Sequence, residues 1–257
     1  MSFNKFIKSC GYENVNAIVG CNDVREWQDG SFYTLDSSKN LKIMCEVENI
    51  VSEDNSLVPR LKTEENLSDI DKPVMWDAYL MKKGKNRELS PMIKGFRINK
   101  NRKCNFLDKG HLIARKFHDH IYKNIKDSER LFYKNVTSNI IYQFCDKNRG
   151  EKGHFGQLQF EQAVKNKLNK SKDDNIAIYY EVEPIFMTNI DKIPIGTRIL
   201  AFEKDDTITK FNEFVDYYSE KIFSVSLPFH VFIPNYSEKF GKVPRRFYER
   251  GEIDWAY

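Results

Sequence analysis

The sequence predicts an α+β protein with a central antiparallel β-sheet and helices packed against it. Apolar and polar residues alternate at residues 176–183 and again at residues 225–233, which is typical of half-buried strands. Apolar residues recur instead at helical spacing in Phe160, Val164 and Leu168, which predicts an amphipathic helix. With 257 residues, 40% of them hydrophobic and 30% charged, the chain is long enough to bury a core and has a globular composition.

The other elements follow from shorter patterns. Residues 41–47 alternate and predict a half-buried strand, whereas residues 51–73 are polar and acidic, which favours a loop. The apolar run at residues 74–81 predicts a core strand. In chain order, the remaining predictions are an amphipathic turn at 3–7, strands at 31–35, 92–98 and 135–144, a helix at 157–170, a strand at 197–202 and a helix at 211–218. Pro184 is expected to end the strand before it, and Pro228 favours an edge or a bulge.

Charge and hydropathy limit the possible classes of protein. The 41 basic and 37 acidic residues give a net charge of +4, so any nucleic-acid-binding surface has to come from clustering. No run of eighteen apolar residues is present, which excludes a membrane-spanning helix. The first ten residues lack the apolar stretch of a secretory signal, so we expect a cytoplasmic protein or export by a leaderless route. Five dispersed cysteines without a Cys-x-x-Cys pair predict free thiols in a reducing compartment.

Three residue types at the centre of the chain suit phosphodiester hydrolysis. Gly110 precedes His111 at the start of a short apolar run, which indicates a side chain presented at a tight backbone bend. The imidazole of His111 can take a proton from water near neutral pH. Asn148, expected in a loop, and Glu161, expected in the first turn of the helix, offer oxygen ligands to a hard divalent cation that stabilises charge on a leaving group.

The order of these elements resembles the DNA/RNA non-specific endonucleases, the ββα-metal or His-Me finger nucleases, and most closely their bacterial toxin-like branch. In order they are the box Asp108-Lys109-Gly110-His111, the segment from Asn139 to Gln143, Asn148 nine residues after Asn139, and the helical Glu161. The resemblance covers residues 70–235. It departs from the family at Lys109, where arginine is usual, which keeps the charge but loses the bidentate fork. The interval from Asn148 to Glu161 is also longer than the commonest form.

The resemblance implies both an architecture and an activity. Two strands would close on one helix to form a ββα-metal site within a nuclease domain of residues 71–257, and residues 1–70 would be an N-terminal extension packed on it. The expected activity is Mg²⁺- or Mn²⁺-dependent cleavage of DNA with little sequence specificity and 5′-phosphate products, with RNA left open as a second substrate.

The resemblance also implies the roles of individual residues. His111 would be the general base, Asn148 the direct ligand of the ion, and Glu161 the holder of a metal-bound water. The basic residues expected to contact phosphate and offset transition-state charge are Lys109, Arg115 and Arg149. Two residues are expected to support loops by hydrogen bonds, Asn139 and Gln143. Asp108 would either orient His111 or cap a turn, and the sequence leaves both open.

Two alternatives come from other classes of protein. One is a nucleic-acid-binding protein with an inactive nuclease fold. The other is a zinc-organised structural domain in which His118 and His120 join Cys104 or Cys145, although their spacing is not of the zinc-finger type. A non-specific nuclease without an export signal endangers its own cell. We therefore expect a toxin or effector paired with an inhibitor or immunity protein, or a defence nuclease that an activating partner switches on.

Overall fold

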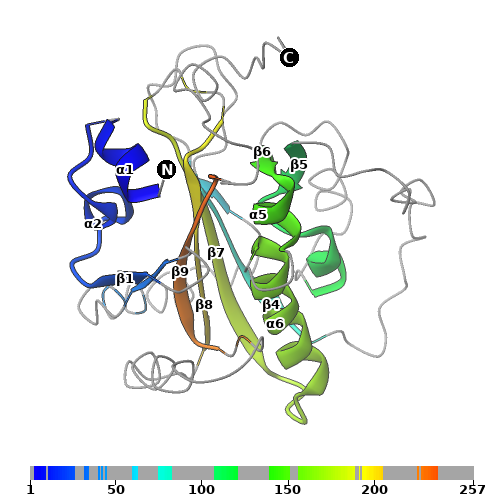
Figure 1. The fold of residues 1–257 in the computed structure, drawn as a ribbon. Coiled ribbons are helices and arrows are strands. Elements are labelled where there is room, and N and C mark those ends of the chain that lie inside the picture. Colours follow the sequence, from blue (N-terminus) through cyan, green and yellow to red (C-terminus); the bar gives the residue numbers. More distant parts are fainter. Residues whose placement is uncertain are drawn as a thin grey trace.

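The computed structural model describes residues 3–9, 11–26, 32–34, 40, 42, 44, 60–62, 75–82, 107–120, 139–150, 156–188, 191, 193–204, 225 and 227–236. Figure 1 shows a long sheet with helix α6 (Gln157–Lys170) lying along one side and the short helices α1 (Phe3–Ser9) and α2 (Val15–Val19) on the other. Within this described part of the chain, no helix is both long and apolar enough to cross a membrane.

Seven of the described strands form one sheet, in the order β1-β2-β9-β8-β7-β4-β3. They are β1 (Val24–Glu26), β2 (Phe32–Thr34), β3 (Arg60–Lys62), β4 (Met75–Met81), β7 (Ala177–Ile185), β8 (Gly196–Glu203) and β9 (Phe229–Pro234). Every neighbouring pair runs antiparallel. The predicted α+β class with a central antiparallel sheet is therefore confirmed, and residues before position 70 contribute three strands to it.

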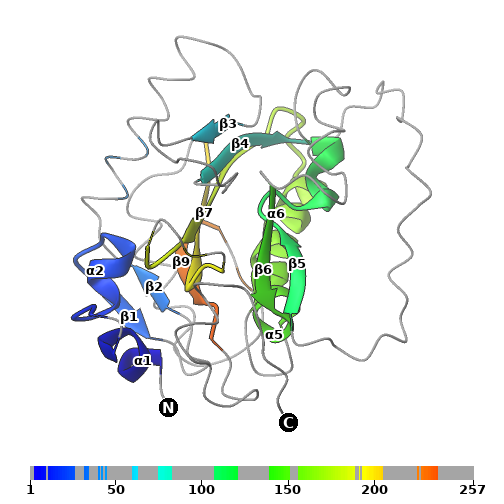
Figure 2. The same cartoon turned by 90° about the horizontal axis from the view of Figure 1, so that it is seen from above.

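A second, two-stranded sheet stands beside the long one and carries the sequence motifs. Strand β5 (Leu107–His111) pairs with β6 (Ile140–Phe144), helix α5 (Cys145–Arg149) follows directly, and a short helix η1 (Arg115–His120) leaves β5. Figure 2 shows β5, β6, α5 and α6 gathered on one side of the long sheet, with α1 and α2 on the opposite side. Two strands and a helix thus pack together as the resemblance implies.

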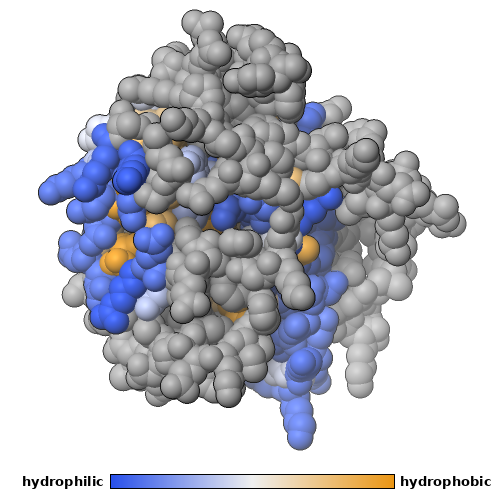
Figure 3. All heavy atoms as spheres, viewed as in Figure 1, coloured by the Kyte–Doolittle hydropathy of each residue, from blue (hydrophilic) through white to orange (hydrophobic). Residues whose placement is uncertain are grey.

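Helix α6 attaches this unit to the long sheet through its apolar face. Phe160, Val164 and Leu168 are completely buried, as their helical spacing predicts. The Phe160 ring meets the ring of Phe229 edge-on, with centroids 5.2 Å apart. Replacing such a buried phenylalanine by alanine costs about 3–5 kcal/mol in comparable cores, so this contact contributes strongly to the placement of α6. Figure 3 shows that the exposed lower end of α6 carries hydrophilic residues instead.

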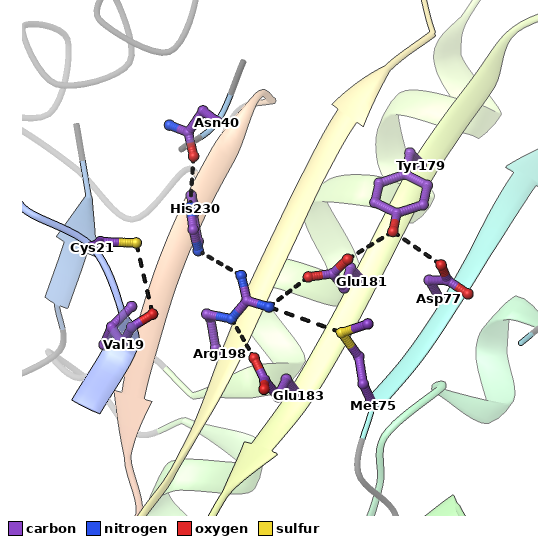
Figure 4. A network of polar contacts seen from close by, with 10 residues as sticks. All are labelled: Val19, Cys21, Asn40, Met75, Asp77, Tyr179, Glu181, Glu183, Arg198 and His230. Atoms are coloured by element: carbon purple, nitrogen blue, oxygen red, sulfur yellow. Dashed lines mark hydrogen bonds and ion pairs between the residues drawn. The ribbon is translucent and has the colours of Figure 1, made fainter. Parts of the chain in front are cut away.

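The other face of the long sheet buries an ionic network around Arg198, shown in Figure 4. Its guanidinium donates to Glu183 and Glu181, at 2.6 Å each. Burial lowers the pKa of Arg198, but the two carboxylates raise it by more, so the net shift is upward and the side chain stays charged. Because guanidinium nitrogens can only donate, the Nε2 of His230 at 3.2 Å must accept, and its Nδ1 then donates to Oδ1 of Asn40 at 2.7 Å.

Several predicted elements differ from the structure. The strand predicted at residues 41–47 is wrong, because Asn40, Lys42 and Met44 are helical. Asn40 and Met44 are buried and stand four residues apart, a spacing that puts them on one helix face. A short apolar run does not distinguish the period of a helix from that of a strand. The predicted loop at residues 51–73 contains strand β3, which pairs with β4.

The predictions made from Pro184 and Pro228 are wrong. Pro184 lies inside β7, opposite Thr197, and does not end the strand. Pro228 precedes β9, which is an interior strand between β2 and β8 and neither an edge nor a bulge. Strands predicted at residues 74–81 and 197–202 and the helix at residues 157–170 are confirmed by β4, β8 and α6. The elements predicted at residues 92–98 and 211–218 lie outside the described residues.

The cysteines do not all behave as predicted. Cys21 is buried and is not disulfide-bonded. Cys145 is disulfide-bonded, so the prediction of free thiols is wrong at that position. The partner sulfur belongs to a residue outside the described part of the chain. Because Cys145 is the first residue of α5, the disulfide ties down the start of the helix that carries Asn148.

Candidate active site

Strand β5 presents its residues alternately on two faces of the hairpin. Asp108 and Gly110 are buried, whereas Lys109 is exposed and His111 is half-buried. Because successive strand residues point to opposite faces, Lys109 and His111 share one face and the buried pair shares the other. His111 is the last residue of the strand, so its ring lies where the hairpin opens toward η1.

Asn139 fixes the chain immediately after His111. Its Oδ1 accepts from the backbone N–H of Ile113 at 2.8 Å, and its Nδ2 donates to the carbonyl of the same residue at 3.2 Å. Its own carbonyl accepts from the N–H of Leu112 at 3.0 Å. Asn139 is completely buried, so these bonds are not exchanged with water and hold the bend in one conformation.

Gln157 connects helix α6 to the same bend. Its Nε2 donates to the carbonyl of His111 at 2.7 Å and lies 2.9 Å from Oε1 of Glu161. Its Oε1 accepts from Nε2 of Gln143 at 3.0 Å, and the Gln157 side chain is completely buried. This residue was missed by the sequence analysis. Its signal was available, because a polar residue four positions before Glu161 lies on the same helix face.

Asp108 binds residues of α5. Its Oδ2 accepts from Nδ2 of Asn148 at 3.1 Å, and its Oδ1 pairs with the guanidinium of Arg149. Its hydrogen bonds therefore orient Asn148, and within the described part of the chain none of them reaches His111 or a turn. Asn148 was expected in a loop but lies in helix α5, and Arg149 keeps about half of its side chain exposed to solvent.

Two neutral oxygens converge beside Gly110. The amide nitrogen of Asn148 is bound to Asp108, so its Oδ1 is directed elsewhere, toward Gly110. Oε1 of Gln143 is buried and accepts no hydrogen bond from the described residues. A Cβ on Gly110 would lie 2.3 Å from Oε1 of Gln143 and 3.1 Å from Oδ1 of Asn148, so only glycine leaves this space open.

These donors fit a hard divalent cation. Mg²⁺ takes oxygen ligands, usually one or two from the protein, and keeps several waters. Asn148 would be the direct ligand, and Oε1 of Gln143 would be available to a water on the ion. Among the described residues, Glu161 has no hydrogen bond to Asn148. Glu161 accepts from Gln157 instead, and Gln157 accepts from Gln143.

Gly110→Ala is expected to weaken Mg²⁺ binding and to cost about 1–3 kcal/mol of stability, as added methyl groups do in packed sites. The new Cβ would displace the Gln143 side chain, which is held by Gln157 and by Thr197 at 3.0 Å each. Urea unfolding gives the stability, and calorimetric titration with Mg²⁺ gives the affinity. A folded variant with wild-type Mg²⁺ affinity would show that these oxygens do not bind the ion.

Glu161 forms a buried ion pair with Lys116 that the sequence analysis did not predict. Their charged atoms are 3.2 Å apart, and Lys116 also donates to the carbonyl of Leu158 at 3.3 Å. Burial raises the pKa of Glu161, and the Lys116 ammonium partly opposes that shift. Burial likewise lowers the pKa of Lys116, against the attraction of the carboxylate. Each charge therefore depends on the other.

Lys116→Met is expected to cost about 2–4 kcal/mol of stability at pH 7, because Glu161 would stay buried without a cation. This loss is somewhat smaller than the loss on breaking a fully buried ion pair. A carboxyl with a raised pKa in the folded state favours folding below its unfolded pKa and loses that contribution as pH rises through the folded value. The deficit should therefore shrink on acidification toward pH 4.

Urea unfolding at several pH values tests this expectation. Lys167→Met is the matched control. It removes an ion pair between Glu203 and a lysine of α6, the helix that carries Glu161, and the side chain of this lysine is 45% exposed. Exposed pairs contribute about 0–1 kcal/mol, so the control should lose little stability at any pH. A Lys116→Met deficit that does not change with pH would contradict the coupling to Glu161.

The other predicted phosphate contacts lie around the hairpin. Lys109 is exposed, with its ammonium 5.9 Å from the centre of the Tyr142 ring. Arg115 begins η1 and is half-buried. Asn235, at the end of β9, holds β6 by accepting from the N–H of Phe144 at 2.7 Å and donating to the carbonyl of Tyr142 at 3.0 Å.

The zinc alternative depends on residues with other contacts. His120 is buried, with Nδ1 2.8 Å from the carbonyl of Met81, and Cys145 is disulfide-bonded. Among the residues described, no group of three or more His, Cys, Asp or Glu side chains could hold a metal ion. Cys104 and the side chain of His118 lie outside the described structure.

Two solved structures of NucA from Streptococcus agalactiae share this architecture. The form with a magnesium ion bound superimposes with a TM-score of 0.50 at 18% identity, covering 91% of this chain and 89% of that one. The form with no metal bound gives 0.52 at 17% identity, over 90% and 89% of the two chains. No protein-family model matches the sequence, and no curated protein matches it. At this level of identity the likeness shows the fold alone: the chain shares the fold of NucA.

Proposed function

We propose that this protein is a metal-dependent endonuclease that hydrolyses phosphodiester bonds of DNA with little sequence preference, with RNA as a possible second substrate to be tested. The observation that supports it most is the free oxygen of Asn148 beside Gly110, one residue before His111. The proposal requires this candidate metal ligand and the candidate base to reach the same phosphate. Nδ2 of Asn148 donates to Asp108, and Gln157 donates to the backbone carbonyl of His111.

In the proposed mechanism, His111 takes a proton from the water that attacks phosphorus. A divalent cation, when bound, supplies positive charge to a phosphate oxygen and to the leaving 3′-oxygen. Asn139 and Gln157 hold the peptide that carries the imidazole, which keeps the base in line with the water. Glu161, paired with Lys116, would orient a water of the site.

The proposed phosphate contacts are Lys109, Arg115 and Arg149. Arg149 has one guanidinium nitrogen on Asp108 and about half of its side chain exposed, so it can still donate to a phosphate oxygen. Such contacts are to the backbone of the nucleic acid and carry no sequence information, which is the basis of the proposed low specificity.

Three findings support the proposal together. The motif order resembles the DNA/RNA non-specific endonucleases, the fold is shared with NucA, and one of the NucA structures has a magnesium ion bound.

The disulfide at Cys145 is typical of proteins in oxidising compartments, which favours an exported toxin or effector with an inhibitor protein over a cytoplasmic defence nuclease.

Incubation with supercoiled plasmid tests the activity. With Mg²⁺ or Mn²⁺ we expect nicked and then linear DNA with 5′-phosphate ends. Chelation with EDTA should stop cleavage, and re-addition of Mg²⁺ should restore it. A protein that retards the plasmid in a gel but never cuts it with either metal would instead be the nucleic-acid-binding protein with an inactive nuclease fold.

A further inference from the structure

Tyr142 stands out on the outer face of the β5–β6 hairpin. Its side chain is 41% exposed, and among the described residues only Leu158 is another large hydrophobic residue with comparable exposure, at 42%. Tyr142 pairs with Lys109 across the two strands, and His111 pairs with Ile140 one step further along the same face. The aromatic ring, the ammonium and the imidazole therefore share one side of the hairpin.

The backbone around Tyr142 is held in place by hydrogen bonds with Asn235. Its carbonyl accepts from Nδ2 of Asn235 at 3.0 Å, and the same asparagine binds the N–H of Phe144 at 2.7 Å. The backbone that carries the ring is thereby tied to the long sheet. The Lys109 ammonium is 5.9 Å from the ring centre, an exposed cation–π contact that contributes little energy and leaves ring surface open to a further partner.

The spacing suits one nucleotide. Diagonal neighbours on the same face of an antiparallel pair lie about 7–8 Å apart, which places Tyr142 roughly one nucleotide from His111 along an extended strand. Aromatic rings bind successive bases of single strands by stacking, without sequence preference, when positive charge follows the phosphates. Lys109 supplies that charge beside the ring. Bases of an intact duplex are stacked on each other and do not offer a free face.

We propose that Tyr142 is a stacking platform for the base next to the scissile phosphate, with Lys109 on the adjoining phosphate, so that the site prefers single-stranded nucleic acid over a duplex. This inference rests on the proposed endonuclease function and names the substrate form of that site. Tyr142 lies between Asn139 and Gln143 in the sequence but was not predicted to have a role.

The test uses a fluorescently labelled single-stranded oligonucleotide and the matching duplex, with the full-length protein and its Tyr142 variants. Tyr142→Ala and Tyr142→Leu should raise the KM for the single strand about 5- to 150-fold, the range for losing one base stack, with kcat changed much less. Tyr142→Phe keeps the ring and should retain wild-type KM. Duplex cleavage should change less than single-strand cleavage in every variant.

Leu158→Ala is the matched control, because it removes an equally exposed apolar side chain from α6 and has no aromatic face. Circular dichroism melting shows that each variant is folded. A single-strand KM that is unchanged in Tyr142→Ala, or equal losses on single strand and duplex, would overturn the stacking proposal while the endonuclease function stands. A wild-type protein that cuts neither substrate with any divalent cation would refute the proposed function itself.

Discussion

Asn148→Ala is expected to reduce Mg²⁺ affinity by more than about 100-fold, and to reduce cleavage at low Mg²⁺ accordingly. Loss of a residue that only hydrogen-bonds to a metal ligand already costs roughly 10- to 100-fold in affinity. The substitution removes the direct oxygen ligand of the proposed site. Folding should persist, because the Asn148 side chain makes one hydrogen bond to the described residues, to Asp108, and Arg149 continues to pair with that carboxylate. Losing that bond costs about 0.5–1.5 kcal/mol.

Calorimetric titration with Mg²⁺ and cleavage at a series of Mg²⁺ concentrations measure this effect. Asn169→Ala is the matched control, since the same replacement is then made at an exposed position of helix α6. High Mg²⁺ should partly restore Asn148→Ala if only affinity is lost. Undiminished cleavage by Asn148→Ala at low Mg²⁺ would reject Asn148 as the ligand.

His111→Ala is expected to slow cleavage by about 10²–10⁴-fold, which corresponds to about 3–5 kcal/mol of activation barrier. Binding of DNA and of Mg²⁺ should be close to wild type, because His111 is proposed as a base and not as a ligand. The wild-type rate should rise with pH, because only a deprotonated imidazole can accept a proton from water. The variant should lose that dependence.

Added imidazole offers a second measurement on the same variant, because a free base can enter the vacated space and restore part of the rate. His120→Ala controls for the loss of a histidine as such, since His120 is buried and bonds the carbonyl of Met81. It should lower stability and leave the rate per folded molecule nearly unchanged. Loss of Mg²⁺ binding in His111→Ala would instead indicate a site with histidine ligands.

The sequence predicted those helices and strands in which the spacing of apolar residues repeats often enough to distinguish a helix from a strand. The fourteen residues of α6 keep their apolar side chains on one face, and this helix matches its predicted range residue for residue. Six of the seven residues of β4 are hydrophobic, and the run has the length of a strand. The helical conformation of Asn40, Lys42 and Met44 and the short strand β3 depend on packing and pairing with distant segments, which local patterns do not encode.

The candidate site divides in a similar way. His111 and Asn148 were predicted from the order and spacing of the motifs that carry the resemblance, and the structure places Gly110 and Asn148 side by side. Lys116 could not be found, because its partner Glu161 comes from a helix 45 residues later in the chain. The opposite directions of Asp108 and His111 could have been predicted, because residues three apart on a strand point to opposite faces.

Supercoiled plasmid incubated with wild type and His111→Ala side by side, at equal folded concentration in Mg²⁺, tests the central claim most directly. Chemistry at this hairpin predicts rapid conversion to nicked and linear forms by the wild type, stopped by EDTA, and conversion at least about 100-fold slower by the variant. Equal rates of cleavage by the two proteins would contradict the assignment of phosphodiester hydrolysis to this site.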